Sequence, residues 1–589
     1  MKILKYISVL FYGILLLSGC EELKIGDAAL EKPPTVTVTR DTVFSKLEYA
    51  ERFLFGGYKT LPYGLNTNWS DKGNKLGMDI LESLTDICHS YMNWGGTNQL
   101  YYSGQYNAGS EDAGNNTKYH YFKEQSWSGI RIAWIFIENA DKIPDADQEY
   151  IDQMKAEARV LIALHYTDMF RNFGGLPWIN KSYNPADKMD LPRLTAKATL
   201  DSIVHQLDLA IPYLPWTISD VNNDGRFTKA SAMGLKARLL LFGASPLFND
   251  DAPYLDGEAA QKFCVWYGGK DPSLWQKAAD AAIELINAVE GNGYYALVNT
   301  GNPRKDFQDA YYLRGNGEVL ISTRVRFKSP GGYWDESYYF YQSAGDYGTA
   351  CPSQEYVDLF SMADGTPITD PNSGYDPDDP FVNRDPRLYE TVLVNGDTYQ
   401  GRTAELWIGG RERKNANFNG TKSGYGIRKF ILERNNATSL GSIVHWPYLR
   451  LAEIYLSAAE ALNEANGGPT SDAYRYVDIV RARAGLNGLS QGLSQQEFRE
   501  AVLQERAKEF GYEEVRWFDI IRWKRSDIFE SKLHGTDLYK NEDGTYRREL
   551  KELPSRYWRN SWSPKWYLSA FPPSEVYKEY GLIQNPGWE

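Results

Sequence analysis

The sequence predicts a mainly α-helical protein in which pairs of helices stack into a curved superhelix, interrupted by large irregular insertions with short strands. Apolar residues recur at three- and four-residue spacings through much of the chain, which is typical of amphipathic helices. Two long stretches rich in Gly, Asn, Tyr and Trp break that spacing. With 589 residues, 42% of them hydrophobic and 24% charged, the chain has the composition of a folded soluble body.

The helical pattern is clearest in segment 149–170, EYIDQMKAEARVLIALHYTDMF. Its apolar residues form one face, and His165 on that face is interpreted as a core histidine. Segment 449–466 is similar and ends at Gly467-Gly468-Pro469, a strong helix stop. The predicted helices span 41–60, 128–142, 147–172, 197–213, 228–247, 273–289, 449–466, 471–484 and 494–525.

The helical pairs, with Ala and Tyr at packing positions, resemble tetratricopeptide repeats. A strict 34-residue period is missing, so the repeats are degenerate. We expect one unit with an N-terminal helical part (41–290), an irregular loop-rich region (291–446) and a C-terminal helical part (447–589). A second irregular stretch, 61–127, interrupts the first part, and Glu318–Phe327 reads as a strand. Long irregular segments in compact proteins are often functional.

The N-terminus predicts export. Lys2 and Lys5 precede an apolar run, Ile7–Leu17, that is too short to span a bilayer. Leu17-Ser18-Gly19-Cys20 then resembles the lipobox of bacterial lipoproteins, which predicts a signal peptide at 1–19 and a lipidated Cys20 with a tether at 20–40. The alternative is an ordinary signal peptide with a chance cysteine. Glu21 and Glu22 resemble the signal that directs lipoproteins of the Bacteroidetes to the cell surface.

Charge and cysteine content exclude several classes of protein. The formal charge is 64 − 77 = −13, without basic runs, so nucleic acid is a poor partner. Cys88, Cys264 and Cys351 allow at most one disulfide among themselves and form no CxxC pair. The sequence does not distinguish three free thiols from one bridge.

The sequence contains neither the HExxH and GxSxG motifs of hydrolases nor the glycine-rich motifs that bind nucleotides. Asp220, Asn222 and Asp224 match the first half of a calcium loop, but Ser231 stands where a bidentate Glu is expected, and a plain turn is the alternative. A glycosidase needs two facing carboxylates. Asp335 and Glu336 are adjacent, so on an extended chain they point to opposite faces. We therefore predict no enzymatic activity and no cofactor, with calcium as the one metal to consider.

Two aromatic-rich loops have the composition of a sugar-binding surface. Sugar rings lie on aromatic faces, and their hydroxyls need fixed polar partners. The loop 91–102 offers Tyr91, Asn93, Trp94 and Tyr101, and the stretch 331–342, GGYWDESYYFYQ, offers a second set. The alternative is that these rings are core, as we expect for Tyr339 and Phe340. The predicted ligand-binding residues are Tyr91, Asn93, Trp94, Tyr101, Tyr333, Trp334, Asp335, Tyr338 and Trp69.

Several motifs, in order along the chain, resemble the SusD/RagB family, the outer-membrane nutrient-binding lipoproteins of the Bacteroidetes. They are Ala156-Glu157-Ala158-Arg159 with Phe173-Gly174-Gly175-Leu176-Pro177, Leu207–Pro215, Thr228–Leu239, Tyr448–Ala461, Glu505–Trp523 and Gln584-Asn585-Pro586-Gly587-Trp588. We interpret the motif residues themselves as structural. In 505–523, for example, Glu513 with Arg516 and Asp519 with Arg522 are spaced for ion pairs within a helix.

The resemblance implies a SusD-like fold and a glycan-binding lipoprotein on the outer membrane, facing outward. Its implied partners are an oligosaccharide or polysaccharide and a TonB-dependent transporter of the SusC type. Two alternatives stay open. One is a peptide- or glycopeptide-binding lid of the RagB type, and the other is a surface glycoside hydrolase with facing carboxylates.

Overall fold

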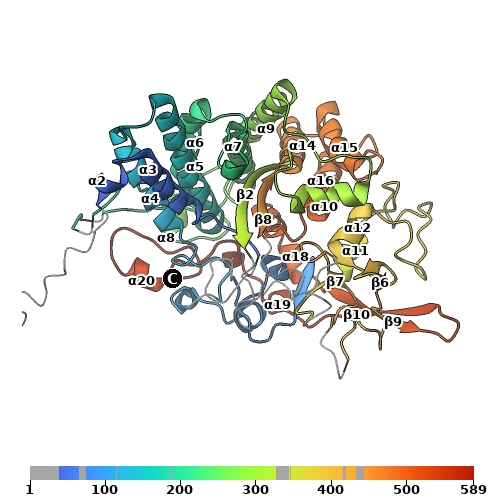
Figure 1. Cartoon of the computed structure of the whole chain (residues 1–589). Coiled ribbons are helices and arrows are strands. Elements are labelled where there is room, and N and C mark those ends of the chain that lie inside the picture. Colours follow the sequence, from blue (N-terminus) through green and yellow to red (C-terminus); the bar gives the residue numbers. More distant parts are fainter. Residues whose placement is uncertain are drawn as a thin grey trace, which may run out of the picture.

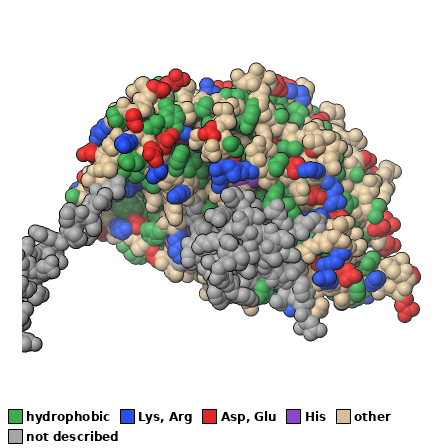
Figure 2. All heavy atoms as spheres, in the orientation of Figure 1, with side chains coloured by type: hydrophobic (Ala, Val, Ile, Leu, Met, Phe, Trp, Pro, Cys, Tyr) green, Lys and Arg blue, Asp and Glu red, His purple; other side chains and the backbone are tan. Residues whose placement is uncertain are grey.

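Most helices lie side by side in a curved row, with loops, short strands and short helices gathered beneath it (Figure 1). The computed structural model describes residues 39–589 except 66–74, 114–115, 185, 189, 327–343, 345–346, 416–419 and 433–442. On the face shown in Figure 2, acidic and basic side chains are interspersed over the row. This face of the helical row therefore carries no broad field of one sign.

The row follows chain order. Neighbours pack in the sequence α3–α4–α5–α6–α7–α9–α14, and α14 also packs against α15 and α16. This arrangement confirms the predicted superhelix of degenerate helical pairs, with α9 and α14 adjacent in space although the irregular region separates them in the chain. The helices are α3 (Leu47–Tyr58), α4 (Ser126–Asn139), α5 (Gln148–Phe173), α6 (Ala196–Ala210), α7 (Lys229–Ala244), α9 (Ser273–Asn292), α14 (Leu451–Asn466), α15 (Ser471–Arg483) and α16 (Gln495–Glu509).

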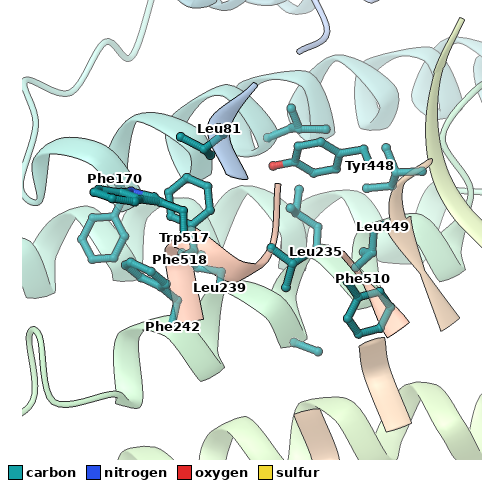
Figure 3. Packing of buried hydrophobic residues seen from close by; sticks show 14 of the residues in the cluster. Leu81, Phe170, Leu235, Leu239, Phe242, Tyr448, Leu449, Phe510, Trp517 and Phe518 are labelled. Carbon is teal, nitrogen blue, oxygen red and sulfur yellow. The ribbon is translucent and has the colours of Figure 1, made fainter. Parts of the chain in front are cut away.

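Helix α5 is the longest member of the row and is largely buried, and it begins within one residue of its predicted start. Asp147 caps it by accepting a hydrogen bond from the backbone N–H of Tyr150. His165, 1% exposed, contacts Thr60 Oγ1 through Nε2 at 2.8 Å, which confirms its assignment to the core. Phe242 of α7 joins Phe170 of α5 to Phe518 of α17 (Arg516–Arg522), with ring centroids 6.4 and 6.2 Å from its own (Figure 3).

Glu157 and Asn585 belong to motifs that the sequence predicts to be structural, and both are buried. Glu157 is fully buried and accepts hydrogen bonds from Arg226 Nη2 at 2.7 Å and from the Tyr58 hydroxyl at 2.7 Å. Near the C-terminus, Asn585 Nδ2 donates to the carbonyl oxygen of Ser569 at 2.7 Å. These side chains join segments far apart in the chain and do not face solvent.

The central region leaves the helical row and returns to it at one place. Strand β2 (Val319–Arg326), which falls on the predicted strand, pairs antiparallel with β8 (Ile443–Arg450), and Arg326 lies opposite Ile443. The N–H of Leu451, which opens α14, donates to the carbonyl of Glu318 at 2.8 Å. The segment 327–442 is therefore an insertion closed at its base by this two-stranded ribbon.

The described parts of the region predicted as irregular contain more helix than the sequence indicates. Its helices and those near the C-terminus are short, and a short helix shows too few turns for periodicity to reveal it. The additional elements are α10 (Pro303–Tyr312), α11 (Gln354–Leu359), α12 (Pro386–Thr391), α18 (Ser526–Glu530), α19 (Trp558–Ser561), α20 (Pro573–Val576), β1 (Cys88–Ser90), β3 (Ala350–Pro352), β4 (Val392–Leu393), β5 (Thr398–Tyr399), β6 (Arg402–Thr403), β7 (Gly426–Ile427), β9 (His534–Lys540) and β10 (Tyr546–Glu552).

A buried cluster of ion pairs joins the insertion to the row. Arg450, the last residue of β8, lies 2.6 Å from Glu318 and 2.9 Å from Glu509 through Nη1. Arg483 at the end of α15 also contacts both carboxylates, and Nη1 of Arg387 on α12 lies 3.1 Å from Glu509. These side chains are at most 1% exposed. Burial alone would raise the pKa of Glu509, but the three guanidinium groups outweigh it and hold that pKa well below its usual range.

The predicted helix 494–525 is wrong as a single helix. It breaks after Glu509, because Tyr512 and Glu514 adopt φ of 64° and 58°, and α17 starts at Arg516. The break turns Glu513 toward Arg450, whose Nη2 lies 2.7 Å away. Arg516 therefore pairs with Asp86 at 2.7 Å. The ion pair between Glu513 and Arg516 that the helix spacing predicts does not form, so that prediction is wrong.

The second ion pair predicted from that spacing does form. Arg522 Nε lies 3.0 Å from Asp519 within α17, where both residues stay on one helix.

Removing the charge of Glu509 tests how far the insertion depends on the buried cluster. Glu509→Gln leaves the guanidinium groups of Arg387, Arg450 and Arg483 short of a counter-charge, so we expect a loss of about 3–5 kcal/mol in the free energy of unfolding. The control is Glu48→Gln, since Glu48 pairs with Arg52 on the surface with 63% of its side chain exposed. Urea unfolding measures both, and equal small shifts would contradict a central role for the cluster.

Glu82 predicts a pH dependence of stability. Burial, and next the charge of Glu514, raise the pKa of Glu82 to about 8, and its Oε1 accepts the Glu514 backbone N–H at 2.6 Å. The folded protein thus binds this proton more tightly than the unfolded chain. The contribution to stability is complete at acidic pH and is lost as the pH rises toward 8.

In Glu82→Gln the neutral amide keeps the acceptor and does not ionise. Between pH 5 and 8 we expect the variant to gain about 2–4 kcal/mol relative to wild type. Thermal or urea unfolding across that range measures the difference, with Glu48→Gln as a surface control. Parallel pH profiles of wild type and Glu82→Gln would overturn the assignment.

Candidate functional site

One surface cavity contains a residue predicted to bind ligand. It has a volume of about 630 Å³, and we call it the Tyr91 cavity. That volume is within the range of sites that hold small molecules or a few sugar rings. The described residues that line it are Tyr91, Ile408, Arg413, Lys414, Lys422, Lys551, Glu552, Leu553 and Pro554.

The fold joins the N-terminal aromatic loop to the central insertion at this cavity. Strand β1 pairs antiparallel with β3, with Ser90 opposite Ala350. The pairing continues one residue further, since the N–H of Tyr91 donates to the carbonyl of Thr349 at 2.6 Å. Tyr91 therefore leaves the strand at the point where two regions distant in sequence meet.

Asn93 and Trp94 are solvent-exposed on the turn that follows Tyr91. Trp94 keeps 42% of its surface accessible, an unusual exposure for tryptophan. The turn is firmly held, because the Asn98 side chain donates to the carbonyls of Ser90 and Met92 at 3.2 and 3.1 Å. Trp94 is thus a large ring presented to solvent on a fixed loop, as the sequence predicts.

A basic side chain lies against the half-buried ring of Tyr91, and others line the same cavity. Lys422 Nζ lies 5.5 Å from the ring centroid. A bridge between Arg413 and Thr421, with the N–H of Lys414 donating to the Thr421 carbonyl at 2.9 Å, brings the two arms of this turn together. Three cationic residues of the insertion are thereby placed on one wall.

Another part of the lining comes from the C-terminal hairpin of β9 and β10, which supplies Lys551 and Glu552. The N–H of Ile408 donates to the Leu538 carbonyl at 2.7 Å, and the N–H of Thr536 donates to the Ser423 carbonyl at 2.8 Å. These bonds dock the hairpin on the insertion and place Lys551 in the lining. No residue of this hairpin is among those predicted from the sequence to bind ligand. The basic residues of RERK at 411–414 and of YRRELKE at 546–552 are the signal that could have drawn attention to this lining.

Tyr101 is not part of the surface, so its prediction as a ligand-binding residue is wrong. It is 1% exposed and stacks on Tyr106 with ring centroids 4.9 Å apart. Its hydroxyl accepts the backbone N–H of Lys118 at 3.0 Å. The π-helical segment η3 (Thr97–Tyr102) carries Tyr101 inward, a turn that a count of aromatic residues does not reveal.

The remaining predicted ligand-binding residues lie outside the described residues. They are Trp69, Tyr333, Trp334, Asp335 and Tyr338. Cys20, the predicted lipidation site, also lies outside them.

The calcium candidate has the geometry of a capped turn. Asp220 caps the short helix η7 (Val221–Asn223) and accepts the Asn222 backbone N–H at 2.9 Å. Asp224 lies 2.8 Å from Arg314 and 3.3 Å from Arg324. Two guanidinium groups at that carboxylate repel a cation, so the geometry favours the turn. Within the described residues, no group of three His, Cys, Asp or Glu side chains is arranged to hold a metal.

The cysteines that the sequence left undecided are Cys88, Cys264 and Cys351. All three are buried free thiols. Burial raises the pKa of the Cys88 and Cys264 thiols, which disfavours the reactive thiolate.

Comparison with known families identifies the class of protein. A profile described as the SusD family matches residues 318–588, and one described as "Starch-binding associating with outer membrane" matches residues 71–241. The chain belongs to the SusD/RagB family. Among the residues that the structure describes, every helix is too short or too polar to span a bilayer.

Individual relatives are distant in sequence and similar in fold. "SusD-like protein P2" of Formosa agariphila is 27% identical over 417 residues, covering 68% of this chain and 71% of the relative. A SusD-like protein from Bacteroides fragilis superposes with a TM-score of 0.70 at 21% identity, covering 94% of this chain and all of that one. A SusD-like carbohydrate binding protein from the same species gives a TM-score of 0.68 at 20% identity, covering 91% and 99%.

The turn that presents Trp94 depends on a glycine. A Cβ on Gly96 would lie 1.8 Å from the carbonyl oxygen of Asn116, and the Gly96 N–H donates to the Leu76 carbonyl at 2.7 Å. We therefore expect Gly96→Ala to displace the turn and to change the fluorescence and quencher access of Trp94, measured against Trp94→Phe to isolate its signal. Gly291→Ala is the control, because a Cβ there meets nothing within 4 Å. An unchanged Trp94 signal in Gly96→Ala would contradict this account.

Proposed function

We propose that the protein is a cell-surface lipoprotein that captures an oligosaccharide or polysaccharide and delivers it to a TonB-dependent, SusC-like transporter. The observation that carries the glycan-binding proposal is the exposed ring of Trp94, 42% accessible, on a fixed turn three residues after Tyr91, which lines the Tyr91 cavity. Cys20 would carry the lipid that anchors the protein to the outer membrane, facing outward.

The site has the chemistry that a sugar needs. The flat ring of Trp94 offers a stacking surface, and the adjacent Asn93 amide is exposed and offers both a donor and an acceptor. One or two stacks at about 1 kcal/mol each, with a few hydrogen bonds of about 1 kcal/mol net, give millimolar to micromolar affinity. Weak binding of this kind suits capture of a long chain followed by its release.

The comparisons support the glycan class and the outer membrane, and the resemblance supports the transporter. One matching profile is described as starch-binding and associated with the outer membrane, and one structural neighbour is titled a carbohydrate binding protein. Starch is the ligand in the description of that profile and does not fix the sugar bound here. The SusC-like partner and the lipid anchor follow from the family resemblance and the lipobox.

The lining of the cavity favours binding over catalysis. A glycoside hydrolase of the usual kind needs two carboxylates across the scissile bond. Among the described lining residues only Glu552 has a carboxylate, and it pairs with Lys532 at 2.8 Å. We therefore propose that the protein is not an enzyme. A peptide-binding lid would present backbone groups along a groove, whereas four of the nine described lining residues here are basic side chains.

Replacing Trp94 tests the proposed site. Trp94→Ala removes the stacking surface, so we expect glycan affinity to fall about fivefold to tenfold or more, with the unfolding transition unchanged because the ring is exposed. Calorimetry or affinity electrophoresis against a polysaccharide panel measures binding. Tyr213→Ala is the matched control, since Tyr213 is 57% exposed on another part of the surface.

Two results would contradict the proposal. Equal binding by wild type and Trp94→Ala would remove Trp94 from the site, and release of shortened sugars from any panel member would favour an enzyme.

A further inference from the structure

We infer that the Tyr91 cavity selects an anionic glycan, one whose sugars carry carboxylate or sulfate groups. The inference rests on the proposed glycan-binding function and names the substrate class. It is carried by the presence of four cationic residues and an aromatic ring in the lining of one cavity, with one of the cations against the ring.

The charge of the cavity is opposite to that of the protein. Arg413, Lys414, Lys422 and Lys551 line it, against one carboxylate, Glu552. The whole chain carries −13, with acidic residues outnumbering basic ones by 77 to 64. A positive cavity on a negative protein gives no added binding energy to a neutral sugar. An anionic ligand would be attracted to the cavity although the net charge of the protein repels it.

The nearby carboxylates are already used. Asp537 forms an ion pair with the buried Arg413 and lies 3.9 Å from Lys551. Glu552 is paired with Lys532 and Arg559. Neither carboxylate pairs with Lys422, so these ion pairs do not neutralise its charge.

Lys422 is placed to receive an anion. Its ammonium group donates to the carbonyls of Tyr347 and Gly348 at 3.0 and 3.3 Å. Across the described part of the chain, no carboxylate lies within 4.0 Å of it. An ammonium group has three donors, and a third can bind a ligand while the carbonyls hold the other two.

The surroundings of Lys422 add a reason to bind negative charge. Burial lowers the pKa of Lys422, and the charges of Lys414 and Arg413 lower it further. A carboxylate or sulfate of the ligand would favour its charged form.

The ring beside this ammonium group fits the rest of a sugar. Tyr91 lies with its centroid 5.5 Å from Lys422 Nζ, so a pyranose on the ring would place a substituent within reach of the lysine. A carboxylate or sulfate oxygen makes a charge-assisted hydrogen bond, which is stronger than the bond of a hydroxyl. Binding should therefore weaken as salt rises, because the cations are partly exposed and screened.

Matched pairs of polysaccharides test the inference. The carboxylate arm compares polygalacturonate with its methyl ester, and the sulfate arm compares a sulfated galactan with its desulfated form. We expect wild type to bind at least one charged member about tenfold or more tightly than its neutral partner, with affinity falling between 50 and 500 mM NaCl. The arm that shows the difference identifies the source of the charge.

Variants assign the effect to the cavity. Lys422→Gln should lower affinity for the charged glycan about tenfold and affinity for its neutral partner much less, because the amide can still donate a hydrogen bond but carries no charge. Lys422→Arg, which keeps the charge, should restore most of the binding, so a loss through misfolding is distinguished from a loss of charge. Lys197→Gln is the control, since Lys197 pairs with Asp201 on the exposed face of α6.

The possible failures are distinguishable. Equal binding of charged and neutral partners that depends on Trp94 would overturn the inference and leave the proposed function standing. Charged-glycan binding that Lys422→Gln and Lys197→Gln reduce equally would also overturn it, because the attraction would then be general. If neither charged nor neutral glycans bind, the proposed function fails and the inference fails with it.

Discussion

The fold depends on one buried carboxylate shared by three guanidinium groups. Glu509 ends α16 and contacts Arg387 of the insertion, Arg450 of β8 and Arg483 of α15. Moving these charges out of water is costly, and the cost is offset only if each charge has its partners in good geometry. The helical row, the ribbon at the base of the insertion and the insertion itself must therefore come together in one arrangement. A purely hydrophobic contact at this junction would be compatible with several relative arrangements of these parts.

The rigidity of that junction bears on the site. The insertion supplies Lys422, and the N-terminal loop supplies Tyr91, so their relative position is set by how the insertion sits on the row. Strand pairing between β1 and β3 holds Tyr91 against the insertion, and hydrogen bonds hold the C-terminal hairpin there as well. Parts of the chain separated by hundreds of residues thus line one cavity without forming one continuous motif.

How far the sequence predicts this protein depends on the range of the interaction involved. Helix α5 is predicted closely because its apolar spacing and its Asp147 cap are local. The break after Glu509 is not, since it brings Glu509 and Glu513 against Arg450, a residue distant in the chain that a local pattern does not include. The short helices of the insertion are likewise set by tertiary packing and have too few turns to leave a pattern.

The same distinction applies to the site. The exposure of Trp94 is predictable, because Asn93 before it and two glycines after it form a local turn signal. Tyr101, eight residues from Asn93, has equally suggestive neighbours but is turned into the core by contacts with Tyr106. The cationic wall is brought together by hydrogen bonds between residues 408 and 538 and between 423 and 536, and no single window of sequence contains it.

The ribbon of β2 and β8 has a consequence for how such proteins diversify. Because Arg326 and Ile443 are neighbours, the two ends of segment 327–442 stay close together whatever lies between them. The entropy of closing a loop grows only slowly with its length, so residues can be added or deleted there at little cost to the helical row. The insertion can therefore change in length and sequence while the helical row keeps its structure. Recombination or drift within it could alter ligand preference while the scaffold and its docking partners are inherited unchanged.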